Sequence, residues 1–254
     1  MPWNPDTYNQ FKQIRYHPFF DLMDMISEKG LKKGVDIGCG TGEQTALLSG
    51  KFEKAHFLGI DSSAEMLAGS EKFAGDNVRF QNRSVEAFAR DGTTWDLIFS
   101  NAALQWANGH QELFPALMAK LHTNGQFAIQ MPVQNENLLN RILLELVQER
   151  PFAGFLQGYR RLSPVLGMDD YAQLMFDSGL GQIQIIQKVY PIIADGPDKL
   201  FDFISGSALI PYMERMSEKQ QELFVTEFKN RIRSTFKFPA IYAFKRLFLY
   251  GTRS

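Results

Sequence analysis

Short apolar runs alternate with amphipathic stretches through the first half of the chain. Five such runs predict strands, at residues 34–37, 56–60, 78–80, 95–99 and 126–131. The stretches between them have helical spacing and predict helices over 42–50, 64–73 and 110–121. Strands that alternate with helices at this spacing form βαβ units, whose right-handed crossovers build a parallel sheet.

Three of the predicted helices carry a capping-box pattern. In this pattern a Ser or Thr and a Glu or Gln three residues later satisfy N–H groups of the first helical turn. The three pairs are Thr41 with Gln44, Ser62 with Glu65, and Ser217 with Gln220.

After Pro132 the pattern changes to longer helical stretches. A helix is expected over 135–148, a Pro-, Gly- and Arg-rich stretch follows, and a short helix over 169–178 ends at Gly179. Strands are expected over 182–190 and 241–251, with mainly helical residues between them. Two insertions, near 133–168 and 191–240, are therefore predicted to cover an α/β sheet.

Composition and charge narrow the function classes. The 254 residues include 27 Lys and Arg against 28 Asp and Glu, which removes the electrostatic argument for a nucleic-acid or anionic-membrane partner. The longest apolar run, 240–244, is far shorter than the roughly 20 residues of a membrane-spanning helix. The single cysteine, Cys39, excludes an internal disulfide, and the first residues do not resemble a signal peptide. We expect a cytoplasmic protein.

Several kinds of catalytic site find no support in the sequence. The four histidines have no metal-ligand spacing, so no metal site is expected. No nucleophile elbow and no Gly-Lys-Ser/Thr phosphate loop are present. No residue is assigned as catalytic.

A glycine-rich run, Asp36-Ile-Gly-Cys-Gly-Thr-Gly42, follows the first predicted strand and opens a helix. Glycines at alternate positions allow a tight turn and close approach of a ligand to the backbone. The spacing departs from the dinucleotide pattern, because Glu43 stands where Gly-x-Gly-x-x-Gly needs its third glycine. Asp36 favours a ligand that carries a cationic amine, and Asp61 ends the second strand where an acid can accept both ribose hydroxyls. The structural alternative is a tight turn with a capping Asp.

Asp-x-Gly-x-Gly-x-Gly, with an acid at the end of the second strand, resembles the class I S-adenosylmethionine-dependent methyltransferases. The resemblance implies a doubly wound, mostly parallel seven-stranded sheet with an antiparallel last strand. It also implies S-adenosylmethionine as cofactor, bound across the carboxyl ends of strands one to four. We expect one integrated domain, with the cofactor half and an N-terminal lid arm in 1–132 and the remaining strands and caps in 133–254.

A narrower resemblance covers nearly the whole chain. Five runs are similar to the trans-aconitate methyltransferase family, at residues 3–8, 99–106, 113–115, 128–132 and 245–248. The malonyl-carrier and juvenile-hormone acid methyltransferases share the broader pattern and also esterify carboxylates. The resemblance therefore implies methyl-ester formation on a small carboxylic acid. The alternatives are a carrier-bound acid, a hydroxyl acceptor, or a module that binds the cofactor without catalysis.

The resemblance also assigns candidate site residues. Those for the cofactor are Tyr8, Arg15, Asp36, Gly38, Cys39, Gly40, Asp61, Ser62, Met66, Ser84, Val85, Asn101 and Gln105. Those for the substrate are Trp3, Trp106, Tyr190, Tyr212 and Arg246. The arm residues can equally be a surface-packed segment, and the aromatic residues can equally be core.

Two positions depart from the family pattern. The acid expected at the adenine edge is Ser84, so that contact is expected to be weaker or to come from the backbone of a neighbour such as Arg83. The arginine expected before Pro211 is Ile210, which cannot hold a carboxylate through two hydrogen bonds. A tricarboxylate substrate is therefore in doubt, and a less charged acid is favoured.

Overall fold

The computed structural model describes residues 12–254, with side chains from residue 16 onward, and the chain divides into two compact units. The sheet unit consists of His17–Pro132, Pro164–Lys188 and Arg246–Ser254. The described part of the helical unit consists of residues 12–16, Val133–Ser163 and Val189–Lys245. The expected border at 132 falls where the chain passes from one unit to the other; that the two form one integrated domain stays a prediction.

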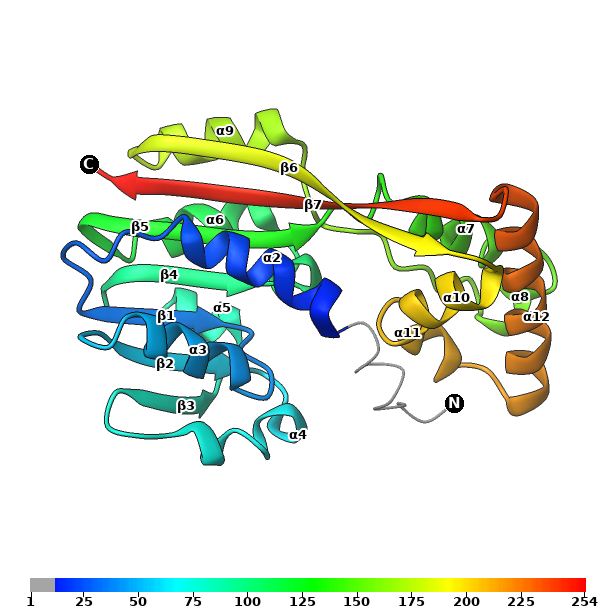
Figure 1. The fold of residues 1–254 in the computed structure, drawn as a ribbon, viewed down its shortest axis with the longest axis horizontal. Coiled ribbons are helices and arrows are strands. Elements are labelled where there is room, and N and C mark those ends of the chain that lie inside the picture. The colour runs from blue at the N-terminus through cyan, green and yellow to red at the C-terminus, as the bar shows by residue number, and fades with distance from the viewer. Residues whose placement is uncertain (1–11) are drawn as a thin grey trace. The chain divides into compact units, whose positions relative to one another are not determined.

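A seven-stranded sheet runs in the order β3-β2-β1-β4-β5-β7-β6 (Figure 1). Its strands are β1 (Lys33–Ile37), β2 (His56–Asp61), β3 (Val78–Asn82), β4 (Trp95–Asn101), β5 (Leu121–Pro132), β6 (Leu180–Ala194) and β7 (Ala240–Arg253). The first five strands are parallel, and β7 pairs with β5 in the antiparallel direction. This confirms the predicted class I architecture, including the reversed last strand.

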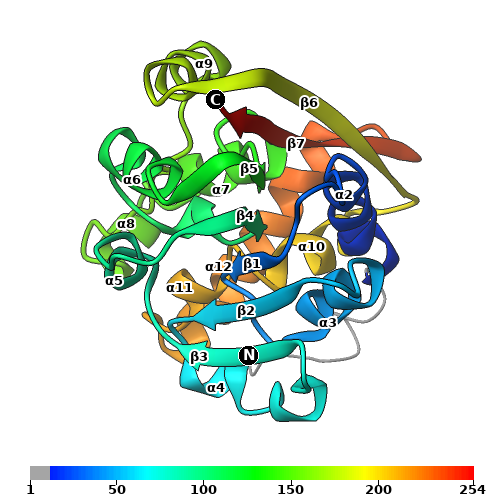
Figure 2. The same cartoon turned by 90° about the vertical axis from the view of Figure 1, so that its left-hand side faces the viewer.

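Helices cover both faces of the sheet in the sheet unit (Figure 2). One face carries α2 (Lys12–Asp24) and α3 (Glu43–Lys51), and the other carries α5 (Val85–Ala89), α6 (His110–Met118) and α9 (Met168–Asp177). The alternation of side chains along β4 and β5 explains this, because Phe99 packs on Phe19 of α2 while Phe127 packs on Phe114 of α6. All four phenylalanines are fully buried.

The helical unit has its own apolar core. Its helices are α7 (Leu138–Leu146), α8 (Phe152–Phe155), α10 (Pro197–Ser205), α11 (Ile210–Met213) and α12 (Glu218–Thr235). The stripe of Phe224, Phe228 and Ile232 on α12 is fully buried in the core of this unit. The predicted capping box of this helix is confirmed, since the Ser217 N–H donates to Gln220 Oε1 at 2.9 Å.

The other two predicted capping boxes are wrong. Gly42 caps α3 in the left-handed region, at φ 81°, because the glycine loop turns directly into the helix there. Ser63, not Ser62, caps the short helix α4 (Ala64–Leu67) by accepting from the Met66 N–H at 3.2 Å. Each error displaces the cap by one position, which is within the usual uncertainty of a sequence-based boundary.

Two predicted helices are also too long. The stretch 64–73 divides into α4 and a 3₁₀ turn, η1 (Glu71–Phe73), with Gly69 in the gap between them, where glycine disfavours a continuous helix. The helix expected to reach 121 ends at Met118, and Leu121 already begins β5. Strand β5 is thus longer than its apolar run, because Leu121 already pairs with Trp95 and the regular pairing with β4 resumes at Gln126, after the exposed residues 122–124.

Candidate functional site

The glycine loop occupies the carboxyl edge of the sheet, directly after β1. Gly38, Gly40 and Gly42 have φ values of 75°, 55° and 81°, a region that favours glycine over other residues. A Cβ on Gly38 would lie 2.1 Å from Ala103 Cβ, so this position requires glycine for packing as well. The N–H groups of Gly38 and Cys39 donate to Ile60 O at 2.7 and 3.0 Å, which ties the loop to β2.

Asp61 fixes the loop from the end of β2. Its Oδ2 accepts from the Gly40 N–H and its Oδ1 from the Ser63 N–H, both at 2.9 Å. A carboxylate has about four acceptor positions, so each oxygen retains a lone pair for a ligand hydroxyl. Asp61 therefore holds the loop and keeps acceptor positions open, and its role toward a ribose stays a prediction.

Asp36 is buried rather than directed to solvent. Its carboxylate accepts from Thr45 Oγ1 at 2.6 Å, which joins β1 to α3. Burial raises the pKa of Asp36 to about 7, the Thr45 hydrogen bond lowers it, and the charge of Asp61 raises it further. A cationic ligand group placed near the loop would favour the ionised form.

The other predicted loop residue with a reactive side chain is Cys39. Burial raises the pKa of its thiol well above the usual range, with Asp36 and Asp61 adding to the effect. The thiol is buried and protonated at neutral pH, so it is not a nucleophile. Cys39 therefore contributes to the loop through its backbone.

The predicted adenine-side residues follow β2 and β3. Met66 is 47% exposed, and its Cε lies 3.2 Å from where a Gly40 Cβ would be, so the thioether lies beside the loop. Ser84 is occupied as the cap of α5 and accepts from the Ala87 N–H at 3.2 Å. The Arg83 N–H donates to Asp61 O at 2.9 Å, so any backbone contact from Arg83 to an adenine amine has to use its carbonyl oxygen. Two further candidates, exposed Ser62 and half-buried Val85, lie in the same loops.

Two amides at the carboxyl end of β4 have buried oxygen atoms that lack a hydrogen-bond partner. Asn101 donates from Nδ2 to Gln44 Oε1 at 3.0 Å, and Gln105 donates from Nε2 to Ala102 O at 2.7 Å. Asn101 Oδ1 and Gln105 Oε1 are buried and accept nothing. Buried polar atoms in folded proteins are almost always hydrogen-bonded, so these oxygens indicate a ligand or water position.

His110 holds the turn that carries Gln105. Its Nε2 lies 3.0 Å from Leu104 O and its Nδ1 lies 2.5 Å from Tyr171 Oη. Burial lowers the pKa of His110, so the ring is neutral. Since a carbonyl oxygen only accepts, Nε2 carries the proton and Nδ1 accepts from the tyrosine.

Gln130 on β5 is a further candidate, to which no motif in the sequence assigned a role. Its side chain is fully buried, and neither Oε1 nor Nε2 has a hydrogen-bond partner. In the sequence, Gln130 stands inside the apolar run 126–131 and inside the run 128–132 that resembles the family. Register pairs Gln130 with Asn101, so the two side chains lie on the same face of the sheet.

The substrate candidates are not all brought together. Trp3 and Tyr8 lie outside the described residues, as does the Arg15 side chain. Half-buried Trp106 and buried Arg246 belong to the sheet unit, whereas Tyr190 and Tyr212 belong to the helical unit. Tyr212 is a core residue there, and its hydroxyl accepts from the Arg161 N–H at 3.0 Å. Their roles toward a substrate stay predictions.

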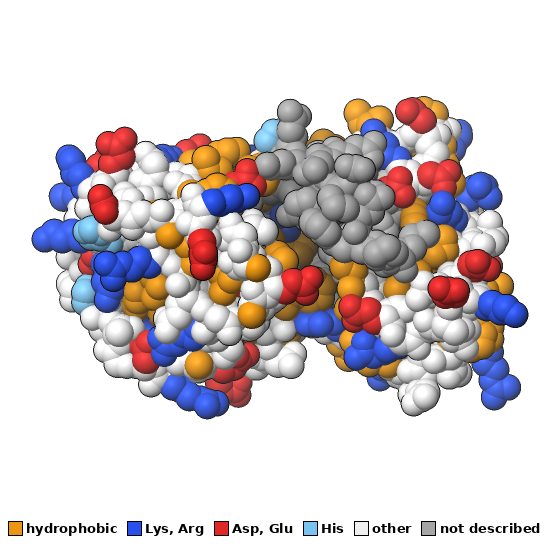
Figure 3. All heavy atoms as spheres, turned by 90° about the horizontal axis from the view of Figure 1, so that it is seen from below, with side chains coloured by type: hydrophobic (Ala, Val, Ile, Leu, Met, Phe, Trp, Pro, Cys, Tyr) orange, Lys and Arg blue, Asp and Glu red, His pale blue; other side chains and the backbone are white. Residues whose placement is uncertain are grey.

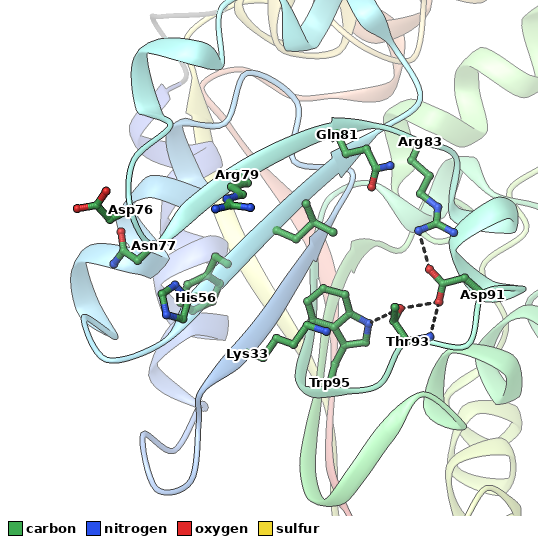
Figure 4. Close-up of a pocket in the computed structure, with 12 residues that line it drawn as sticks. Lys33, His56, Asp76, Asn77, Arg79, Gln81, Arg83, Asp91, Thr93 and Trp95 are labelled. Carbon is green, nitrogen blue, oxygen red and sulfur yellow. Dashed lines mark hydrogen bonds and ion pairs between the residues drawn. The ribbon is translucent and has the colours of Figure 1, made fainter.

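A separate groove of about 490 Å³ is lined by residues near the beginnings of strands β1 to β4, away from the glycine loop (Figure 4). Lys33, His56 and Arg79 lie along it, and the Lys33 ammonium is 4.1 Å from the centroid of the Trp95 ring. Arg83, the expected source of a backbone contact to adenine, also lines this groove, but none of the other candidate cofactor or substrate residues does.

Three further features concern residues 12–254, which the structure describes. Among them, no group of three His, Cys, Asp or Glu side chains is placed to hold a metal ion. Within the same residues, no helix is long and apolar enough to cross a membrane. On the face in Figure 3, basic and acidic side chains of the described residues are interspersed rather than segregated.

Comparisons with known proteins agree with this geometry. A methyltransferase-domain family model matches residues 35–125, which contain the glycine loop, Asp61 and Gln105. The trans-aconitate 2-methyltransferase of Deinococcus radiodurans is 36% identical over 260 residues and covers 100% of this chain and 99% of its own length. The enzyme of that name from Delftia acidovorans is 29% identical, with 100% and 99% coverage. The solved structure of YcgJ from Bacillus subtilis has the same fold, with a TM-score of 0.61, 17% identity, and coverage of 94% of this chain and 98% of its own.

Proposed function

The chain belongs to the trans-aconitate 2-methyltransferase family of class I S-adenosylmethionine-dependent methyltransferases, and we propose that it esterifies a carboxylate of a small organic acid. The enzyme class and the cofactor follow from that membership. The observation that carries the proposal is the carboxyl edge of the sheet, where the glycine loop pinned by Asp61 adjoins buried amides with unused hydrogen-bonding atoms.

The residues present at this edge fit S-adenosylmethionine. Asp61 offers lone pairs to the ribose hydroxyls, exposed Met66 offers an apolar surface to the adenine, and the loop glycines let the backbone approach the methionine part. Asn101 Oδ1 and Gln105 Oε1 can accept from the ammonium group. When bound, the cofactor supplies a methyl group on a positively charged sulfur.

The chain's part in the reaction is to bind, orient and exclude water. A carboxylic acid has a pKa of about 4 and is already ionised at neutral pH, so its oxygen needs no base. Holding that oxygen in line with the methyl–sulfur bond can contribute about 7–11 kcal/mol through proximity and orientation. This agrees with the assignment of no catalytic acid or base.

A hydroxyl acceptor receives less support from the site. It would require a general base near the methyl group. The neutral histidine beside the Gln105 turn, His110, has both ring nitrogens engaged, with Leu104 O and Tyr171 Oη. An acceptor that arrives ionised does not need such a group.

The proposal also concerns how many carboxylates the acceptor carries. The similar enzymes are named for trans-aconitate. In this chain Ile210 stands where the family pattern has an arginine, and an unpaired carboxylate is costly to bury. We therefore favour an acid with fewer charges, held by Arg246.

A methyl-transfer assay tests the proposal. The purified chain would be incubated with S-adenosylmethionine labelled in its methyl group and with trans-aconitate, fumarate or octanoate in turn. The expected product is a labelled methyl ester that releases labelled methanol in mild base. Cofactor binding by calorimetry without transfer to any acid would overturn acid esterification, and a base-stable labelled ether would favour a hydroxyl acceptor.

A further inference from the structure

Gln130 is buried in an arrangement that is unusual for a glutamine. The side chain has no exposed surface, yet both amide atoms lack hydrogen-bond partners. Its backbone is fully part of the sheet, and its carbonyl oxygen accepts from the Ala102 N–H at 2.9 Å. The unmet hydrogen bonds therefore belong to the side chain alone.

A second buried glutamine on the same strand shows what the chain does when it satisfies such a group. Gln126 lies four residues earlier, on the same face, and is 3% exposed. Its Oε1 accepts from the Ser27 N–H at 2.7 Å and from Tyr250 Oη at 2.9 Å, and its Nε2 donates to Ser27 O at 2.8 Å. Every polar atom of this amide has a partner from the chain itself.

The register places Gln130 among other polar groups. It pairs with Asn101 on β4 and with Phe248 on β7, so the side chains of all three lie on one face. Arg246 lies two residues from Phe248 on that face, opposite Pro132. The amide thus lies between the Asn101 and Arg246 positions, all within the sheet unit.

From this placement we propose that Gln130 anchors the acceptor's carboxylate and so determines substrate binding; the inference rests on the proposed function. The Nε2 group donates to a carboxylate oxygen beside the Arg246 guanidinium, and Oε1 accepts from a water held with the acid. Strand β5 is separated from β1 and its glycine loop by β4, a distance of about 10 Å between strands. The proposed partners of the ribose and the ammonium group, Asp61, Asn101 and Gln105, lie on β2 and on or just after β4, which leaves the Gln130 amide on β5 for the acceptor.

The substitution Gln130→Met, with Gln126→Met as its matched control, tests this assignment. Gln130→Met removes the amide at similar volume, and Gln126→Met does the same where all hydrogen bonds are made. A buried polar group without partners is destabilising, so Gln130→Met should raise the thermal unfolding midpoint of the ligand-free protein, while Gln126→Met lowers it. This stability comparison requires no knowledge of the acceptor.

The functional measurements separate the acceptor from the cofactor. For Gln130→Met we expect the KM of the acid that wild type methylates to rise at least tenfold, with the Kd of S-adenosylmethionine within twofold of wild type. Gln130→Glu places a negative charge beside the carboxylate and should reduce kcat/KM further than Gln130→Met. Gln126→Met should leave both constants within twofold.

The results that would overturn the assignment are distinct from a failure of the proposed function. A lower midpoint for Gln130→Met, an unchanged acid KM, or a tenfold rise in the cofactor Kd alone would each reject Gln130 as the acceptor anchor. If wild type binds the cofactor and methylates no acid, the proposed function fails. Calorimetric titration of trans-aconitate, fumarate and octanoate into the S-adenosylhomocysteine complex then decides: loss of binding in Gln130→Met supports the anchor, and absence of binding to wild type rejects it.

Discussion

The two edges of the sheet treat their polar side chains in opposite ways. At the amino edge, before β4 and β5, Asp91 is bonded to Lys120 at 2.5 Å and to Arg83 at 2.6 Å. Asp96 accepts from the backbone N–H groups of Lys32 and Lys33 at 3.1 and 2.9 Å. Each of these carboxylates finds its partners within the chain.

At the carboxyl edge the chain leaves polar atoms unmatched. Asn101, Gln105 and Gln130 each keep a buried amide atom without a partner. Each carboxylate oxygen of Asp61 accepts one hydrogen bond from the backbone and keeps a second lone pair. The carboxylates of the amino edge thus contribute to stability, whereas the carboxyl edge keeps buried polar atoms without partners, and it is at the carboxyl ends of their strands that open α/β sheets generally bind ligands.

The largest expected effect is a pH-dependent change in the free energy of unfolding, caused by the raised pKa of Asp36. Burial raises the pKa of Asp36 from 3.8 to about 7. The folded chain therefore keeps this proton where the unfolded chain has lost it, and the stability contributed by Asp36 falls as the pH rises from about 4 to about 7. In Asp36→Asn this loss disappears, so the variant should gain about 4 kcal/mol over wild type between pH 4 and pH 8. Urea unfolding at several pH values measures the gain, and a difference that does not change with pH would contradict the burial effect.

Asp91 provides the control of opposite sign. Burial acts to raise the pKa of its carboxyl, but hydrogen bonds from Lys120, Thr93 and Arg83 together hold it well below the usual range. Its contribution is present at neutral pH and is lost as the pH falls below the unfolded value. Asp91→Asn should therefore be less stable than wild type at pH 7, and the two should converge in acid.

The next largest effect is on cofactor affinity at Asp61. Asp61→Ala removes the acceptor of the ribose hydroxyls and releases the Gly40 and Ser63 N–H groups. Hydrogen bonds to a charged acceptor contribute about 1.5–3 kcal/mol, so the Kd should rise by about ten- to a hundredfold in titration calorimetry. The amino-edge control, Asp96→Ala, should lower the unfolding midpoint and leave the Kd unchanged. Equal effects of both variants on the Kd would remove the distinction between the edges.

A smaller effect on cofactor affinity is expected from a substitution in the glycine loop. Gly40→Ala places a Cβ at φ 55°, 3.2 Å from Met66 Cε. The left-handed conformation costs a non-glycine residue roughly 1–2 kcal/mol of stability. The added Cβ also blocks the close approach of a ligand to the loop backbone, so cofactor affinity should fall about tenfold. In Gly50→Ala the new Cβ meets nothing within 4 Å inside α3, and this variant should bind normally with slightly higher stability. Normal binding by Gly40→Ala would assign the loop a structural role only.

The smallest effect concerns how much acceptor charge the enzyme accommodates. Ile210→Arg restores the family's cation and should raise the rate on trans-aconitate relative to octanoate by about tenfold, equivalent to 1.4 kcal/mol. Ile193→Arg adds the same charge at a 61% exposed position of the same unit and should leave the ratio unchanged. Efficient turnover of trans-aconitate by the unmodified chain would mean that another basic residue holds the second carboxylate.

The fold and the position of the glycine loop beside Asp61 could be predicted from the sequence because both depend on local patterns. Alternation of strands and helices indicated the sheet, and the stripe of Phe224, Phe228 and Ile232 indicated a buried helix face. The glycine loop and Asp61 were recognisable because their spacing follows from the length of one βαβ unit.

What the sequence could not predict depends on contacts between distant segments. The two backbone hydrogen bonds of Asp61 and the burial of Asp36 under a bond from Thr45 require the folded loop. In the sequence, Gln126 and Gln130 look alike, since both are glutamines in one apolar strand. In the structure, the Gln126 amide bonds with Ser27, whereas the Gln130 amide has no partner. Only the register and the partners of each amide distinguish them.

A crystal structure of the complex with S-adenosylhomocysteine tests the functional assignment of the carboxyl edge most directly. We expect the ribose hydroxyls within hydrogen-bond distance of Asp61 and the methionine part beside Asn101 and Gln105. Ligand density in the groove along Lys33, His56 and Arg79, or at the amino edge beside Asp96, would contradict it (Figure 4).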